Sequence, residues 1–105
     1  MRMLYQPDVN EINLSTVFYA LSDQIRLDII KTLAEIGEQS CGALEINVPN
    51  STLSHHYKVL RESGVTHTRI EGTQRFISLR HNDLNTRFPG LLSAILQGLE
   101  PGKSS

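Results

Sequence analysis

One stretch, residues 50–64, constrains the fold more than any other part of the chain; it reads N-S-T-L-S-H-H-Y-K-V-L-R-E-S-G. Within it, Leu53, Tyr57 and Leu60 recur at the i, i+4 and i+7 spacing that places side chains on one face of a helix. A helix with one apolar face has to pack that face against a core. The sequence therefore predicts an amphipathic helix over about residues 51–63.

The opposite face of this helix is polar. Successive residues are turned by about 100°, so hydroxyl, imidazole and amine groups gather on that face and its flanks: Ser51, Thr52, Ser54, His55 and Lys58. Hydroxyls and an imidazole can hydrogen-bond the edges of DNA bases, whereas the lysine, one turn further on, suits a phosphate. The alternative is a merely solvated face, which every surface helix has.

Further helical segments flank this stretch. Apolar spacing predicts one helix over about residues 8–21, a second over about 23–36, a short third over about 41–46 and a final helical region over about 83–99. Two helices joined by a short turn, the second with a polar face, form a helix-turn-helix.

Cap residues support these boundaries. Ser22 and Asn50 precede predicted helices and can accept hydrogen bonds from first-turn N–H groups. Gly37 and Gly64 suit the residue that closes a helix, and Pro89 suits the first turn of a last helix.

After Gly64 the apolar period changes from that of a helix to that of a strand. Two β-prone runs, 65–70 and 75–79, flank the sequence E-G-T-Q, which predicts a β-hairpin over about residues 66–79. A hairpin that follows such a helix is a wing. Arg69 and Arg75 on it suit the minor groove of DNA or its phosphates, and the alternative for one of them is an ion pair with Glu71.

These elements predict a mainly α (α+β) fold of five or six helices and one two-stranded β-hairpin wing, in a single winged helix-turn-helix domain over residues 1–105. Residues 1–6 are expected to form an arm of uncertain order, and residues 100–105 a loose tail.

The first and last helices carry more apolar surface than a single chain needs. We expect a homodimer whose interface combines two apolar stripes: Leu14, Val17, Phe18 and Leu21 with Leu92, Ile95, Leu96 and Leu99.

Charge is distributed unevenly along the chain, whose net charge is -1. Residues 51–80 contain five cations and two anions, a balance of +3, and the remaining residues contain five cations and nine anions, a balance of -4. A locally basic segment can bind phosphate while the rest of the chain stays acidic. This balance favours nucleic acid as the partner of the predicted helix and wing.

Several functional classes are disfavoured. No run approaches the ~20 apolar residues of a membrane span, no signal peptide is visible, and a single cysteine, Cys41, fits the reducing cytoplasm. No glycine-rich phosphate loop and no nucleophile with an evident base appear. We therefore expect a cytoplasmic protein that is not an enzyme.

The quoted residues resemble the ArsR/SmtB family of bacterial repressors. The similarity runs from about Leu21 to Leu79 and rests mainly on the run S-H-H-x-K-V-L-R-E-x-G, with support from L-S-D, R-L and Ile30 before it and from Arg69, Glu71-Gly72 and Ser78-Leu79 after it. The resemblance implies a winged helix-turn-helix homodimer whose first and last helices form the interface and whose recognition helices enter successive major grooves. It also implies that DNA is released when a metal or an oxidant binds.

The usual metal ligands of that family are missing. Where many members carry Cys-x-Cys, this chain has one thiol, Cys41, and one thiolate cannot by itself build a soft-metal site. At the last-helix site His81 and Asp83 stand in swapped order, and Ala94 and Gln97 occupy the positions of the opposing ligands. We expect no metal and no cofactor.

The sequence thus predicts a homodimeric repressor that binds double-stranded DNA at a short pseudo-palindromic operator; it names no inducer. The alternatives are a winged-helix module that docks protein, and a metal or redox sensor that uses Cys41. Buried, Cys41 would be only a small apolar residue.

Overall fold

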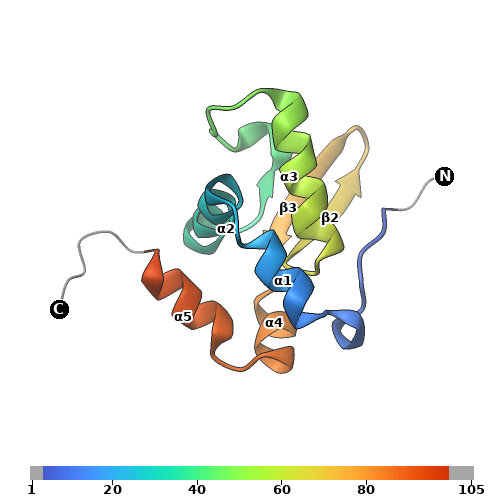
Figure 1. Cartoon of the computed structure of the whole chain (residues 1–105). Helices are drawn as coiled ribbons and strands as arrows, with labels where there is room; N and C mark the ends of the chain where they lie inside the picture. Colours follow the sequence, from blue (N-terminus) through green and yellow to red (C-terminus); the bar gives the residue numbers. More distant parts are fainter. Residues whose placement is uncertain (1–3, 100–105) are drawn as a thin grey trace.

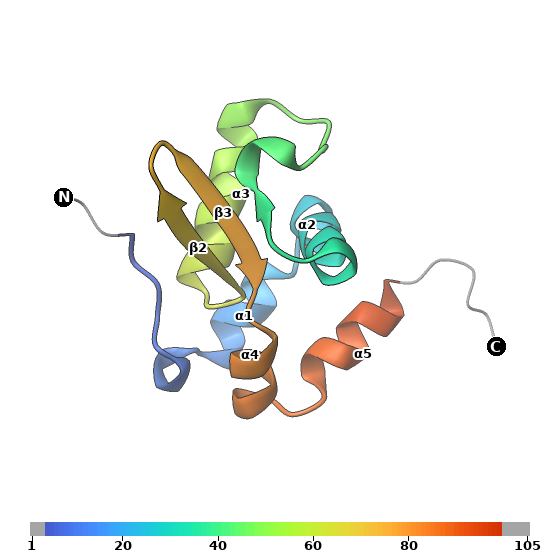
Figure 2. The same cartoon turned by 180° about the vertical axis from the view of Figure 1, so that it is seen from behind.

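The computed structural model describes residues 4–99, in which five α-helices lie on one face and at one end of a small antiparallel sheet (Figures 1 and 2). The helices are α1 (Leu14–Ala20), α2 (Gln24–Ile36), α3 (Asn50–Glu62), α4 (His81–Arg87) and α5 (Leu91–Gly98). The strands are β1 (Gln39–Ser40), β2 (Thr66–Glu71) and β3 (Gln74–Leu79). This is the predicted mainly α fold with a β wing. No helix within residues 4–99 combines the length and the apolar character that crossing a bilayer requires.

The core lies where α2, α3 and the inner face of the sheet meet, with α1 and α4 beneath (Figures 1 and 2). Its fully buried side chains include residues from the N-terminal segment through to β3: Ile12, Val17, Ile29, Ile30, Leu60, Val65 and Ile77. The apolar face predicted for α3 is confirmed, since Leu53 and Leu60 are buried and Tyr57 is half-buried. This packing holds α3 at the surface of the domain.

The sheet has three strands in the order β1-β3-β2, so the prediction of a two-stranded hairpin was incomplete (Figure 2). Strand β1 contains only Gln39 and Ser40, which pair with Ile77 and Phe76 of β3. A two-residue strand shows no alternating pattern, because alternation needs at least four residues to register.

The N-cap predictions were wrong by one residue. Helix α3 begins at Asn50 itself, and Pro49 occupies the N-cap without a side-chain hydrogen bond. Helix α2 is capped by Asp23, whose carboxylate accepts hydrogen bonds from Ile25 N at 2.9 Å and from Arg26 N at 3.2 Å.

The glycine predictions are confirmed. Gly37 and Gly64 close α2 and α3 with φ of 81° and 87°, a left-handed backbone that side chains disfavour. Gly90, also left-handed, precedes α5, so Pro89 stands outside that helix rather than in its first turn.

Three predicted helical segments are shorter or divided. The helix expected over residues 41–46 is a single 3₁₀ turn, Cys41–Ala43. The segment expected over 8–21 breaks at Ile12 into a 3₁₀ turn, Val9–Glu11, and α1. The region expected over 83–99 divides into α4 and α5, as the further helix predicted near Pro89 implied, and α4 begins already at His81. The arm predicted for residues 1–6 is described only from Leu4 on, and the predicted loose tail over 100–105 lies outside the described residues.

Candidate nucleic-acid interface

The first turns of α3 present an unbroken polar surface. All five residues predicted to meet DNA from this helix are exposed: Ser51, Thr52, Ser54, His55 and Lys58. Their neighbours Leu53, His56 and Leu60 are buried, which fixes the rotation of the helix about its own axis. The predicted face is therefore the face that the fold leaves open.

The N-terminus of α3 is left without a side-chain cap. The first N–H groups of any α-helix lack partners within the helix, and the helix dipole places partial positive charge there. With Pro49 at the N-cap, these donors point to solvent, where a phosphate oxygen is a suitable acceptor. Asn50, predicted as the cap, is instead a first-turn side chain on this surface.

A buried polar cluster holds α3 against α2. The guanidinium of Arg26, 5% exposed, donates from Nε to the Ala20 carbonyl at 2.6 Å and from an Nη to His56 Nδ1 at 3.1 Å. Because a guanidinium can only donate, Nδ1 of His56 accepts and the ring proton lies on Nε2. His55 and His56 therefore have separate roles, one outward and one structural.

Sequence reasoning overlooked the structural role of His56. The signal was present, because position 56 lies three residues after Leu53 and four before Leu60, on the edge of the apolar face.

The 3₁₀ turn before α3 is joined to that helix by Tyr57, whose hydroxyl donates to the Cys41 carbonyl at 3.2 Å. Burial, with a smaller effect from Cys41, raises the pKa of Tyr57 to about 12, so the hydroxyl stays protonated and can donate.

Cys41 is poorly suited to redox chemistry. Burial raises the pKa of the half-buried Cys41 thiol, and the positive charges of Arg75 and Arg61 offset this effect only in part. A raised pKa lowers the fraction of thiolate, the form that reacts with oxidants and metals. The environment therefore does not favour the predicted alternative of a redox role.

The two wing arginines lie on opposite faces of the hairpin. Arg69 pairs with Phe76 and Ile70 with Arg75 in the register of β2 and β3, and successive residues of a strand alternate in direction. Arg75 therefore shares the inner face with Ile70 and points toward α3, whereas Arg69 lies on the outer face.

Arg69, also predicted to meet DNA, is engaged in ion pairs within the chain. Its guanidinium forms salt bridges with Glu38, at 3.0 Å, and with Glu71, and it stacks over the Phe76 ring at 4.5 Å. The hydrogen bond from Arg69 lowers the pKa of Glu38, and both carboxylates raise the pKa of Arg69. The ion pair with Glu71, the stated alternative, is the one present.

A groove of about 290 Å³ lies between α3, the wing and the Cys41 turn, and Arg75 stands on its wall. The opposite wall includes Asn50, Ser54 and Tyr57. Among the described residues no ion pair involves Lys58 or Arg75. These two cations are free to meet an anion beside the first turns of α3.

The other two cations of residues 51–80 serve the fold. Arg61, 8% exposed, donates to the Tyr5 carbonyl, and Arg80 donates to the Pro7 carbonyl and pairs with Asp83 at 2.8 Å. The +3 balance read from the sequence is thus concentrated in fewer outward-facing groups than the count suggests.

The apolar surface expected at a dimer interface is present in part. Leu14 and Phe18 are exposed, at 41% and 52%, and Tyr19, which sequence reasoning left out, is exposed at 59%. The predicted residues Leu21, Ile95, Leu96 and Leu99 are partly buried against the core.

The assignment of Val17 and Leu92 to the dimer interface was wrong. They are 1% and 7% exposed and belong to the core of the single chain, so they have no area to offer a partner. The apolar spacing of α1 does not distinguish the side that faces the core from the side that faces outward.

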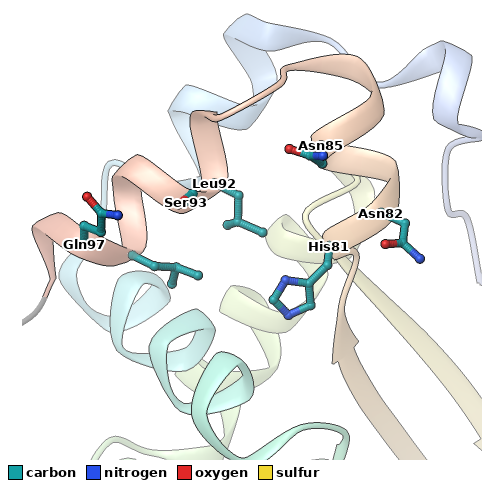
Figure 3. A pocket seen from close by; sticks show the side chains of 7 residues that line it. His81, Asn82, Asn85, Leu92, Ser93 and Gln97 are labelled. Atoms are coloured by element: carbon teal, nitrogen blue, oxygen red, sulfur yellow. The ribbon is translucent and has the colours of Figure 1, made fainter.

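A second hollow, of about 770 Å³, opens between α4 and α5 (Figure 3). Its polar lining consists of amide and hydroxyl side chains and one imidazole, around Leu92 and Leu96: His81, Asn82, Asn85, Ser93 and Gln97. Asp83, the other ligand suggested by the family's last-helix site, is bound to Arg80 instead. No group of three or more His, Cys, Asp or Glu side chains within residues 4–99 is arranged to hold a metal ion.

Comparison with known proteins identifies the family. The family described as "Bacterial regulatory protein, arsR family" matches residues 23–67. A Bacillus subtilis (strain 168) protein described as an uncharacterized HTH-type transcriptional regulator, YceK, is 42% identical over 82 residues, which cover 75% of this chain and 82% of that protein. The chain belongs to the arsR family.

Other arsR-family relatives carry more specific names. The arsenical resistance operon repressor of Bacillus subtilis (strain 168) is 36% identical over 78 residues, which cover 72% of this chain and 70% of that protein. The crystal structure of the transcriptional repressor BigR from Xylella fastidiosa matches with a TM-score of 0.58 and 38% identity, over 71% of this chain and 85% of that one.

A further crystal structure, of an ArsR family transcriptional regulator, has a TM-score of 0.64 over 95% of this chain and all of that one. At 19% identity it supports the winged helix-turn-helix fold alone. The predicted family and fold are thus confirmed, and the protein is a transcriptional regulator of the arsR family.

Proposed function

We propose that this regulator is a homodimeric repressor that binds double-stranded DNA through α3 and the groove beside Arg75. The observation that carries the proposal is the open N-terminal half of α3, which has no side-chain cap and whose polar side chains lie next to Arg75, a wing cation that forms no ion pair within residues 4–99. Relatives that are named repressors support it.

The contacts divide by chemistry. Ser51, Thr52, Ser54 and His55 carry hydrogen-bonding groups on short or rigid side chains near the helix start, and they read base edges in the major groove. Lys58 and Arg75 lie beside that region and bind phosphates, which position the domain and supply the salt-dependent part of the affinity.

The apolar surface that residues 4–99 leave uncovered supports a dimer. Leu14, Phe18 and Tyr19 are exposed along α1, and α5 lies at the edge of the domain, away from the wing (Figure 1). A two-fold axis through these helices pairs the same surface from both copies. Two α3 helices related by such an axis read two half-sites of opposite direction, hence a pseudo-palindrome.

Fluorescence anisotropy with duplexes from the region upstream of its own gene tests DNA binding. We expect a site bound at least about 10³-fold more tightly than random duplex at physiological salt. Affinity should fall steeply as salt rises, because the contacts release counterions. Equal, weak affinity for every duplex without salt dependence would favour the alternative of a protein-docking module.

Light scattering tests the dimer with a matched pair of variants. Phe18→Asp places a charge in the proposed interface, and Ile36→Asp makes the same change at a side chain of similar exposure on α2, 58% against 52%. We expect Phe18→Asp to shift the protein to monomer and Ile36→Asp to leave it dimeric. A monomeric parent protein, or a Phe18→Asp variant that stays dimeric, contradicts the interface.

A further inference from the structure

The segment before the first helix is fastened to the wing by one side chain, Gln6. Its Nε2 donates to the Thr68 carbonyl at 2.9 Å, and its Oε1 accepts from the Thr68 amide at 2.8 Å. One carboxamide thus pairs with both backbone groups of a β2 residue, as a neighbouring strand would. Because β2 is the edge strand in the order β1-β3-β2, this contact lies on the open side of the sheet.

The contact lies at the root of the wing. Thr68 is the last buried residue of β2, and from Arg69 to Arg75 every residue of the hairpin is exposed. On the other side of the sheet, the two residues of β1 pair with Phe76 and Ile77 at the same level. The hairpin is therefore held on both edges at its root, by β1 on one side and by Gln6 on the other.

The segment that carries Gln6 is itself anchored on both sides of this residue. Arg61, near the C-terminal end of α3, donates to the Tyr5 carbonyl at 3.3 Å. Arg80, just before α4, donates to the Pro7 carbonyl at 2.8 Å, and Pro7 is buried. Gln6 thus joins the wing to a point that is tied to the recognition helix.

We propose that Gln6 is a positioning residue that sets the wing relative to α3, so that Arg75 reaches the DNA phosphate. The proposal rests on the DNA-binding function proposed above. Arg75 stands opposite Ile70, which lies two residues beyond Thr68, or roughly 7 Å along the strand. A tilt of about 10° at the root moves this position by about 1 Å, which exceeds the ~0.5 Å spread of distances that a hydrogen bond tolerates.

We call the pair of hydrogen bonds between Gln6 and Thr68 the clip, and the first test measures this clip without DNA. Amide hydrogen exchange at Thr68, followed by NMR, should speed up in Gln6→Ala and by a similar factor in Gln6→Met, because Met keeps the length of the side chain but cannot donate a hydrogen bond and accepts one only weakly through its sulfur. Gln24→Ala is the matched control, since the Gln24 side chain donates to Asp28 of the same helix, α2, at an exposed position far from the wing. Unchanged Thr68 exchange in Gln6→Ala would show that the clip does not hold the wing.

The second test asks whether the clip acts through Arg75. We expect Gln6→Ala to weaken operator binding by about three- to tenfold, the range that one or two neutral hydrogen bonds support, and to reduce the salt dependence. In an Arg75→Ala background the same change should have little further effect, because the contact that it positions is gone. A general loss of folding would instead weaken binding equally in both backgrounds.

The outcomes separate this proposal from the one on which it rests. A parent protein that binds no DNA, yet shows protected Thr68 that Gln6→Ala exposes, refutes the DNA-binding proposal and leaves the clip as a structural contact. A parent that binds its operator while Gln6→Ala keeps full affinity and salt slope refutes the positioning role alone. Equal effects of Gln6→Ala with and without Arg75 also overturn it.

Discussion

The two arginines of the wing offer a direct test of the DNA-binding surface, because they differ in direction and not in charge. Arg75 lies on the inner face, in the groove next to α3. Arg69 lies on the outer face and is bound to Glu38 and Glu71. Both substitutions, Arg75→Ala and Arg69→Ala, remove a guanidinium from the same hairpin, at positions six residues apart.

The expected magnitude follows from counterion release. Each phosphate neutralised on B-DNA contributes about 0.9 to the slope of log affinity against log salt. A dimer that loses one phosphate contact per subunit should therefore show a slope smaller by about 1.8. Arg69→Ala should change the slope by less than about 0.5, because its charge is already balanced by two carboxylates.

The measurement is a salt series by fluorescence anisotropy, with both variants and the parent on the same operator duplex. Thermal unfolding of each variant serves as the control for folding, since a partly unfolded wing would imitate a lost contact. Lys58→Ala should resemble Arg75→Ala, because within residues 51–80 Lys58 is the other cation that forms no ion pair with a described residue.

Two results would refute this reasoning. Equal slopes for Arg75→Ala and the parent would mean that the inner face of the wing does not meet phosphate. A larger effect from Arg69→Ala than from Arg75→Ala would mean that the salt bridges to Glu38 and Glu71 open on binding and that the outer face is the one in contact.

Three further expectations concern base reading, backbone strain and metals. His55→Ala should lose discrimination at one base pair per half-site, a difference in binding free energy of about 1–3 kcal/mol that competition with mutated operators measures. An equal loss of affinity for all sequences would instead make His55 a phosphate contact. Gly64→Ala should lower the free energy of unfolding by about 1–2 kcal/mol, because alanine disfavours the left-handed backbone at this position. Overpacking should lower it by about 1–3 kcal/mol more, because a Cβ at Gly64 would lie 2.6 Å from the buried Ile12 side chain. Gly72→Ala, left-handed but with open space around it, should show only the first loss in thermal melts, and equal losses would contradict the clash. Zinc, cadmium or arsenite at one equivalent per subunit should leave DNA affinity unchanged, since too few side chains of metal-ligand type lie together. A tenfold loss of DNA affinity that a chelator reverses would reveal a missed metal site.

Local sequence alone determined the recognition helix. Its apolar residues repeat with the helical period, Gly64 marks its end, and the polar positions therefore had to face outward once the apolar ones were buried. The hairpin followed for a similar reason, because a change to a two-residue period and a turn with glycine are readable within a dozen residues. The family resemblance rested on these same local runs.

Contacts between distant residues were not readable in this way. Whether Arg69 or Arg75 faces α3 depends on the register of β2 with β3 and on Glu38, which lies 31 residues before Arg69. The burial of Val17 and the exposure of Tyr19 depend on which side of α1 meets the core. Periodicity shows that one face is apolar but does not show what covers it.

Gln6 shows most clearly what could not be predicted from the sequence. A glutamine next to a proline near the start of a chain resembles a loose arm, and its partner, Thr68, lies 62 residues away. Hydrogen-bonding ability is a property of the side chain, but its use depends on the backbone group that folding brings within 3 Å. The sequence by itself determined which elements form and which face of α3 is open; only the tertiary structure decided which charges remain free and what holds the wing, because both depend on distances between residues far apart in the chain.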